Sequence, residues 1–338
     1  MRVLVVKMSS LGDVVHALPG VTDAARALGD RVRFDWVVEE AFAAIPARHP
    51  AVDQVLPIAW RRWRGDLRRH RAELAAFLRS LRAQRYDLVV DAQGLIKSAA
   101  VTALARGTVK AGLSRASARE GLAALAYRRR VAVPKGGHAV DRVRRLFAGA
   151  LDYPAPAGEP DFGLTPAARP TGRCVLLHGT TWQSKHWPER FWIDLAQRAG
   201  DTLEVVVPWG NQAERERAER IAAAAPARVL PRGPLAALID ELAGASLVVG
   251  VDSGLAHLAA ALGVPTLVVY GPTSSALTGS RGARARNLQA GFPCSPCLAR
   301  QCRYRGPPQP VDGMPVEPAC FATLTPERVW RAAAELAR

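Results

Sequence analysis

Apolar and polar positions along this chain alternate in a pattern that is typical of parallel α/β sheets. Short, almost wholly apolar runs follow one another, and stretches whose apolar residues recur with helical spacing separate them. In the first half, strands are predicted at residues 3–6, 34–38, 54–57, 88–91 and 109–113. Helices are predicted around residues 21–28, 70–84, 95–105 and 138–150.

A second series of the same kind follows a proline-rich stretch over residues 153–160, which predicts a linker between two domains. Its predicted strands are residues 174–178, 203–208, 228–230, 247–251 and 266–270. Its predicted helices lie near residues 189–199, 213–224, 235–243 and 254–261. A last helix over about 326–337 begins after Thr325, and its apolar stripe suits packing against either domain.

These patterns predict an α/β protein of two doubly wound domains whose strand ends face each other across a cleft. The first domain covers residues 1–154 and the second covers 155–323. Residues 324–338 form a terminal helix that is allowed to pack back on the first domain. The length of 338 residues also favours two domains over a single core.

The composition is that of a folded protein, with 49% apolar and 22% charged residues. No apolar run approaches the roughly 18 residues that a membrane-spanning helix needs. The apolar core of a signal peptide is also missing from the start of the chain, because Lys7 interrupts the run over residues 3–6. The protein is therefore predicted to be cytoplasmic.

The net charge of +16 is concentrated in the first half of the chain. Residues 1–154 contain 27 Lys and Arg against 14 Asp and Glu, whereas residues 155–338 contain 19 against 16. Nucleic acid is a common partner of such basic proteins. It is not expected here, because no RNA-binding, zinc-finger or helix-turn-helix signature is present.

The positive charge is dense between Trp60 and Arg71, where tryptophans interleave with arginines. The guanidinium groups of Arg61, Arg62 and Arg64 can bind phosphates while the indoles settle at a lipid interface. The alternative is a solvated, arginine-rich face in a chain that prefers Arg to Lys.

A polar loop after the first predicted strand contains Ser9, Ser10, Gly12 and Asp13. It lies outside the carboxyl end of a strand, where α/β sheets bind their ligands. Most nucleotide-binding folds have a glycine-rich phosphate cradle at this position, whereas this chain has a carboxylate, which suggests a base. The alternative is that Asp13 only caps the helix that follows, since Asp is favoured at helix N-termini.

The loop after the first strand of the second predicted domain suits a phosphate. Thr180 and Thr181 offer hydroxyl groups, and Lys185 offers a positive charge that can stabilise a leaving diphosphate. Glu214, after the next strand, is a weaker candidate for holding a ribose or sugar hydroxyl.

A further polar turn follows the predicted strand over residues 247–251. Ser253 and Gly254 open a helix there, and the free amide groups at a helix N-terminus favour phosphate. Asp252 would repel phosphate but can accept hydrogen bonds from sugar hydroxyls. His257 lies one turn into the same helix end, where the alternative to a binding role is a structural one.

Together these loops resemble the lipopolysaccharide heptosyltransferases, and the resemblance covers nearly the whole chain. The matching motifs are residues 5–13, 34–40, 91–98, 185–189 and 251–257. The pair Ser-Ser-Leu-Gly-Asp and Asp-Ser-Gly-Leu-Ala-His is specific. Within the family, the Asp-Trp-Val-Val-Glu-Glu and Arg-Arg-Trp-Arg segments are most similar to heptosyltransferase I, which adds the first heptose to the Kdo of the inner core.

The resemblance implies a GT-B fold and an inverting transfer of L-glycero-D-manno-heptose from ADP-heptose to the Kdo of Kdo-lipid A, in lipopolysaccharide inner-core biosynthesis. Asp13 is then the general base that deprotonates the acceptor hydroxyl. Lys185, Thr180, Thr181 and the helix end at Ser253 stabilise the leaving ADP without a metal or another cofactor.

The resemblance also assigns binding residues and partners. The donor-binding residues are Ser9, Ser10, Gly12, Thr180, Thr181, Lys185, Glu214, Asp252, Ser253, Gly254 and His257. The acceptor-binding residues are Arg61, Arg62, Arg64, Lys97 and Arg119. The implied partners are ADP-L-glycero-D-manno-heptose and phosphorylated Kdo-lipid A, with the protein peripheral on the cytoplasmic face of the inner membrane.

Two other functions remain open at this point. One is a heptosyltransferase II or III that adds a later heptose, and the other is a nucleotide-sugar or lipid-binding module without turnover. The departure from the first-heptose branch is a C-x2-C-x4-C-x17-C series made of Cys294, Cys297, Cys302 and Cys320, which is similar to a cluster in the heptosyltransferase II branch. These cysteines suit a structural metal, a disulfide or reduced thiols.

Overall fold

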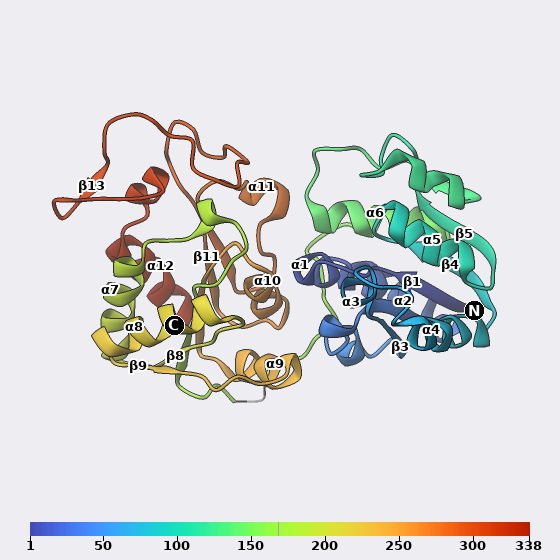
Figure 1. Ribbon diagram of the computed structural model, residues 1–338, viewed down its shortest axis with the longest axis horizontal. Helices are drawn as coiled ribbons and strands as arrows, with labels where there is room; N and C mark the ends of the chain where they lie inside the picture. The colour runs from blue at the N-terminus through green and yellow to red at the C-terminus, as the bar shows by residue number, and fades with distance from the viewer. Residues whose placement is uncertain (168) are drawn as a thin grey trace. The chain divides into compact units, whose positions relative to one another are not determined.

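The computed structural model describes residues 1–167 and 169–338. The chain divides into two compact units, Met1–Leu164 and Thr165–Arg338, which are coloured blue to green and yellow-green to red in Figure 1. The boundary follows Leu164 rather than residue 154, because the proline-rich stretch packs on the first unit. Arg144 donates a hydrogen bond to the carbonyl oxygen of Gly158 at 2.9 Å, and Phe162 is buried.

The first unit, all of whose residues are described, forms a parallel sheet in the order β3-β2-β1-β4-β5-β6. The strands are β1 (Arg2–Val6), β2 (Arg33–Glu39), β3 (Val52–Ile58), β4 (Tyr86–Asp91), β5 (Gly107–Leu113) and β6 (Arg129–Val131). The α-helices are α1 (Leu11–Val15), α2 (Leu18–Leu28), α3 (Trp60–Trp63), α4 (Arg71–Ala83), α5 (Ile96–Leu104) and α6 (Ala139–Leu151). The 3₁₀ turns are η1 (Gly29–Arg31), η2 (Glu40–Phe42), η3 (Pro46–Arg48) and η4 (Gly121–Ala126).

The described part of the second unit repeats this arrangement in the order β12-β11-β10-β7-β8-β9, with all six strands parallel. Its strands are β7 (Arg173–Leu177), β8 (Glu204–Val207), β9 (Ala227–Val229), β10 (Leu247–Val251), β11 (Thr266–Tyr270) and β12 (Ala285–Gln289). Its α-helices are α7 (Glu189–Gly200), α8 (Gln212–Ala224), α9 (Leu235–Gly244), α10 (Gly254–Ala261), α11 (Ser275–Thr278) and α12 (Pro326–Ala337). Two 3₁₀ turns, η5 (Gln183–Lys185) and η6 (Ala319–Thr323), and a small hairpin of β13 (Pro310–Val311) and β14 (Met314–Pro315) complete it.

The pattern of apolar runs predicted five strands in each unit and missed the sixth. β6 and β12 both lie at the edge of their sheets. Their sequences, Arg-Arg-Val and Ala-Arg-Asn-Leu-Gln, contain few apolar residues, and neither strand is fully buried. An edge strand needs no continuous apolar run because it is not covered on all sides, so apolar patterning detected the edge strands β3 and β9 but not these two.

The tryptophans of the Arg-rich segment do not lie at the surface as predicted. Trp63 is only 3% exposed and packs on Phe77 of α4, with ring centroids 5.8 Å apart. Its indole nitrogen donates a hydrogen bond to Glu73 at 3.1 Å, and Trp60 packs against the same hydrophobic cluster. The placement of the indoles at a lipid interface was therefore wrong for Trp63, which α3 turns toward the core between the sheet and α4, whereas Trp60 is partly exposed.

The terminal helix α12 packs on the second unit. Its residues Val329 and Ala333 join a hydrophobic core with Phe191 of α7. The indole of Trp187, just before α7, donates a hydrogen bond to the carbonyl oxygen of Leu324 at 2.9 Å, which fixes the approach to α12. Among the described residues, no helix has both the length and the apolar character needed to cross a bilayer.

Replacing Trp63 with Ala removes a large buried ring and leaves a cavity beside Phe77. We expect the free energy of unfolding of the first unit to fall by about 3–5 kcal/mol, measured by urea denaturation. Trp60→Ala is the matched control at a partly exposed site and should cost less. An equal loss for both variants would contradict the burial of Trp63.

Candidate active site

Polar loops gather where the strand order reverses at the centre of each sheet. In the first unit, β1 and β4 lie side by side, and the loops that follow them contain residues 7–13 and 92–95. In the second unit, β7 and β10 are the corresponding neighbours, followed by residues 178–188 and 252–253. Ligands of doubly wound sheets bind at these switch points, so each unit has a candidate site of its own.

Asp13 both completes the capping box at the start of helix α1, whose N-cap is Ser10, and presents a carboxylate at the surface of the candidate site in the first unit. Its Oδ2 atom accepts hydrogen bonds from the backbone N–H and the hydroxyl of Ser10, at 3.0 and 2.7 Å. Its Oδ1 atom lies 3.8 Å from the Nζ atom of Lys7, and the side chain is 48% exposed. The helix cap and the candidate base are therefore the same side chain, with one oxygen given to each role.

The neighbours of Asp13 keep it ionised. Burial acts to raise the pKa of its carboxyl group, but the charge of Lys7 and the hydrogen bonds from Ser10 outweigh this effect, so the pKa is lower than usual. Lys7 is itself buried, and its ammonium group donates to the carbonyl oxygen of Ala92 at 3.1 Å. A base that must accept a proton from an attacking hydroxyl has to be ionised beforehand.

A cavity of about 430 Å³ adjoins Asp13 within the first unit. Four cationic side chains line it: those of Lys7, Arg119, Lys135 and Arg142. Only one carboxylate, that of Asp13, is among the lining residues of this cavity. The cavity therefore combines a base with a surface that attracts an anion.

The predicted acceptor residues do not all lie at this cavity. Arg119 lines it, and Lys97 reaches its edge by donating a hydrogen bond to the hydroxyl of Ser9 at 3.0 Å. Arg62 instead forms ion pairs with Glu40 and Glu73, at 3.2 and 2.7 Å. Its charge is thus neutralised within the protein.

Arg61 and Arg64 influence the charge state of Lys97. Burial lowers the pKa of the Lys97 ammonium group, and the positive charges of Arg61 and Arg64 lower it further, against the opposing effect of Glu39. The guanidinium group of Arg61 lies over the ring of Phe42, 5.0 Å from its centroid. The positive charges of these two arginines therefore act on Lys97 through space.

The loop residues predicted to bind the donor, Ser9, Ser10 and Gly12, lie in the first unit beside Asp13. The amide oxygen of Gln93 accepts hydrogen bonds from the backbone N–H groups of Met8 and Ser9, at 2.8 and 3.4 Å. The loop after β4 therefore holds the loop after β1 in place. Ser10 is committed to the cap of α1.

The candidate site of the second unit is a network of buried and partly buried polar groups around Asp252. Its Oδ2 atom lies 2.7 Å from Nζ of Lys185 and accepts a hydrogen bond from the hydroxyl of Thr273 at 2.7 Å. Its Oδ1 atom lies 3.2 Å from Nε2 of His257, whose other ring nitrogen lies 2.9 Å from the hydroxyl of Ser280. Sequence reasoning missed Thr273 and Ser280, which belong to a different segment of the chain.

The state of Asp252 follows from these contacts. Burial opposes its ionisation, but the hydrogen bond from His257 and the charge of Lys185 hold the pKa of the carboxyl well below its usual range. Asp252 and Lys185 thus form a buried ion pair. The ammonium group of Lys185 also lies over the ring of Trp182, 4.7 Å from its centroid.

The other predicted donor residues surround this ion pair. Ser253 caps α10 by accepting a hydrogen bond from the N–H of Ala256 at 3.4 Å, and Gly254 begins the helix. Thr180 is half-buried, with its hydroxyl 3.5 Å from the carbonyl oxygen of Asp252. Thr181, next to it, is exposed.

Glu214 lies against the loop that contains Thr180. It accepts a hydrogen bond from the N–H of Gly210 at 2.8 Å. A Cβ atom at Gly179 would lie 2.8 Å from its carboxyl group, so only glycine allows this approach. The absence of a side chain at position 179 therefore lets Glu214 lie against the loop that contains Thr180.

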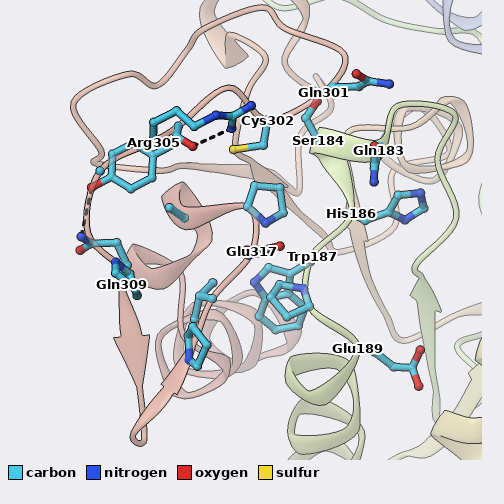
Figure 2. A pocket seen from close by; sticks show the side chains of 18 of the residues that line it. Gln183, Ser184, His186, Trp187, Glu189, Gln301, Cys302, Arg305, Gln309 and Glu317 are labelled. Atoms are coloured by element: carbon cyan, nitrogen blue, oxygen red, sulfur yellow. Dashed lines mark hydrogen bonds between the residues drawn. The ribbon is translucent and has the colours of Figure 1, made fainter.

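A cavity of about 730 Å³ also lies in the second unit, and Ser184 and His186, the chain neighbours of Lys185, line it (Figure 2). His186 and Glu189 lie on one side of it, and Cys302 and Arg305 lie on the other. None of the predicted donor residues lines it.

Comparison with known proteins gives a consistent result. The model of glycosyltransferase family 9 (heptosyltransferase) matches residues 74–306. Lipopolysaccharide heptosyltransferase 1 of Pseudomonas aeruginosa is 51% identical over 97% of this chain and 96% of its own length. The chain belongs to glycosyltransferase family 9.

Solved structures of family 9 enzymes agree with this result. The structure of Escherichia coli heptosyltransferase WaaC with ADP is 46% identical, covers 85% of this chain and 92% of its own, and superposes with a TM-score of 0.80. The structure of the same enzyme with ADP-2-deoxy-2-fluoro heptose is 45% identical, covers 86% and 93%, and gives a TM-score of 0.77.

Family membership confirms several predictions made from the sequence. The chain is a glycosyltransferase with the predicted α/β architecture of two doubly wound units, as in GT-B heptosyltransferases. Its likeness to heptosyltransferase 1 confirms the predicted branch, and a heptosyltransferase II or III or a module without turnover is not favoured.

The cysteines of this family 9 chain are free thiols. Cys174 and Cys320 are buried, and Cys294, Cys297 and Cys302 are exposed. Burial, and to a lesser extent the neighbouring thiol groups, raises the pKa of the Cys320 thiol to about 12. No group of three or more His, Cys, Asp or Glu side chains in residues 1–167 and 169–338 is arranged to hold a metal ion.

Replacing Lys7 with Met removes the charge beside Asp13 but keeps an unbranched side chain of similar length. We expect the pKa of Asp13 to rise, so that sugar transfer is lost at a higher pH as the solution is acidified. The pH dependence of ADP release measures this shift of the acid limb. Lys7→Arg, which keeps the charge, should retain the wild-type limb, and an unshifted limb in Lys7→Met would contradict the role of Lys7.

Proposed function

We propose that this glycosyltransferase moves L-glycero-D-manno-heptose from ADP-heptose to the Kdo of phosphorylated Kdo-lipid A, with inversion at the anomeric carbon. One observation carries the proposal. Asp13 is held by the cap of α1 at the edge of a cavity lined by four cationic side chains. An anionic acceptor in that cavity would place its hydroxyl beside an ionised carboxylate.

The nucleotide part of the donor is supported by the relatives. E. coli WaaC, at 46% and 45% identity, was solved with ADP and with an ADP-heptose analogue. In this chain we place the diphosphate at Thr180, Thr181, Lys185 and the amide groups that open α10. We place the sugar hydroxyls at Asp252 and His257, and a hydroxyl of the ribose at Glu214.

The reaction is a single displacement. Asp13 takes the proton of the acceptor hydroxyl while the oxygen forms a bond to the anomeric carbon of the heptose. The bond from that carbon to the diphosphate oxygen breaks, and its electron pair leaves with ADP. Lys185 and the helix N-terminus at Ser253 stabilise the charge that develops on the leaving group, a role that fixed donors perform well in a partly buried site.

The acceptor is a lipid, so the enzyme has to work at a membrane surface. Kdo is a sugar acid, and its carboxylate and the phosphates of lipid A match Lys97 and Arg119, with Arg61 and Arg64 near Lys97. We propose that the protein is peripheral on the cytoplasmic face of the inner membrane. Ser9 and Gly12, in the Asp13 loop, would contact the donor sugar as it meets the acceptor.

Asp13→Asn tests the base directly. The amide oxygen can still accept the hydrogen bond from Ser10, so the cap of α1 is retained while the base is lost. We expect turnover to fall by about 10²–10⁴, measured as ADP released from ADP-heptose with Kdo-lipid A present, while calorimetry shows ADP binding near the wild-type level.

Asp13→Ala removes both roles and should lose at least as much turnover. Near-normal turnover in either variant would reduce Asp13 to a helix cap. Failure of the wild-type enzyme to release ADP with this acceptor, together with activity on one that already carries a heptose, would reject the first-heptose assignment.

Arg119→Ala tests the cationic cavity. Removing this charge should raise KM for the acceptor by about 10- to 100-fold, since a hydrogen bond to a charged group contributes about 1.5–3 kcal/mol. The KM for ADP-heptose should change little. Arg145→Ala, at an exposed position on α6, is the matched control. Equal effects on both substrates would contradict an acceptor role.

A further inference from the structure

Exposed apolar side chains gather on α5 and on the turn η4 of the first unit. Leu122 and Leu125 of η4 are 59% and 75% exposed, and Ile96 at the start of α5 is 54% exposed. Ala100 and Leu104 are also exposed. With Ile96 they have the spacing of one helix face.

The turn and the helix lie side by side. Ala99 of α5 packs with Ala123, Ala124 and Tyr127 in one small hydrophobic cluster. The N–H of Ile96 donates a hydrogen bond to the carboxylate of Glu120 at 2.7 Å, just before η4 begins. The exposed side chains of the two elements therefore form one surface, here called the apolar patch. It comprises Ile96, Ala100, Leu104, Leu122 and Leu125.

Cationic side chains border the apolar patch. Arg115, Arg119 and Arg128 are exposed in the segments that flank η4. The side chain of Arg115 lies next to Gly121, since a Cβ atom at that glycine would be 3.1 Å from it. The carboxylate of Glu120, the acidic side chain in this segment, is already bound to the backbone of Ile96.

We propose that the apolar patch inserts into the interfacial layer of an anionic lipid bilayer, with the flanking arginines against the lipid headgroups. Leucines surrounded by arginines suit this environment, because apolar burial and attraction to anionic lipids add together. A second copy of the chain is disfavoured as the occupant, since a symmetric contact would bring two sets of arginines together.

The position of the patch supports a lipid surface. Leu95 and Arg119 line the cavity beside Asp13. Ile96 follows Leu95 directly in the chain, Leu122 comes three residues after Arg119, and both belong to the patch. A lipid whose anionic head occupied the cavity would have its acyl chains near the patch. This part of the argument rests on the proposed lipid-linked acceptor. The expected binding of the patch to a bilayer that contains no acceptor does not depend on that proposal.

The test is sedimentation with vesicles of phosphatidylethanolamine and phosphatidylglycerol, with phosphatidylcholine vesicles for comparison. The wild-type chain should bind the anionic vesicles more tightly. Leu122→Ser combined with Leu125→Ser should lower the partition coefficient at least about tenfold, given the apolar area of two leucines. Met314→Ser, at a side chain 51% exposed in the second unit, is the matched control and should bind as wild type.

The charges are tested by Arg115→Gln combined with Arg128→Gln. Each lost arginine should weaken binding to anionic vesicles about fivefold and leave binding to phosphatidylcholine unchanged. If the variant with Leu122→Ser and Leu125→Ser bound anionic vesicles as tightly as the wild type, the proposal would be overturned. So would a dimer of the wild type, seen by sedimentation velocity, that the leucine variant disperses without any change in vesicle binding.

A separate assay distinguishes this proposal from the proposed function. With a deacylated, soluble acceptor, the leucine variant should release ADP at the wild-type rate, because none of its substitutions touches the cavity. Loss of vesicle binding in an enzyme that retains this activity supports the patch. No transfer by the wild type, together with patch-dependent vesicle binding, would reject the proposed acceptor and leave the membrane surface standing.

Discussion

The reversal of strand order at the centre of each sheet is the constraint on which the rest of this heptosyltransferase depends. The central strands β1, β4, β7 and β10 are buried on both faces, so they have almost no room for polar side chains along their length. Polar chemistry is therefore confined to their carboxyl ends, where crossovers to opposite sides leave two adjacent loops uncovered. Both units use this position, one for a carboxylate and a cationic cavity, the other for a buried ion pair.

Much of this arrangement could be predicted from the sequence, because buried parallel strands are continuous apolar runs and their polar loops stand out. Asp13, Lys185 and Asp252 were found in this way. The edge strands β6 and β12 could not be, since their own sequences contain few apolar residues, unlike those of the opposite edge strands β3 and β9. Trp63 was misplaced because interleaved arginines mask the periodicity of a helix as short as α3. The cavity cations Lys135 and Arg142 come from a segment far from Asp13 in sequence, and only the fold brings them together.

The charges of the candidate sites in the two units are compensated in different ways. Lys185, Thr273 and His257 all contact the carboxylate of Asp252. Its charge is therefore neutralised inside the protein before any donor arrives. A lysine already paired with a carboxylate attracts a diphosphate less strongly than an unpaired one. If Lys185 binds the diphosphate as proposed, this pairing limits how tightly ADP is held after transfer. In the first unit, by contrast, the cations outnumber the carboxylate, and the surplus charge is available to a substrate.

The double use of Asp13 has a consequence for comparing related chains. One oxygen holds the first turn of α1 and the other faces the cavity. Glutamate at this position, the third of the helix, would carry the same charge and can complete the same capping box with Ser10. Natural selection for stability alone would thus accept either acid here in a descendant that had lost its activity. Retention of an acidic residue at position 13 therefore marks an intact helix start and is not by itself the sign of a working enzyme.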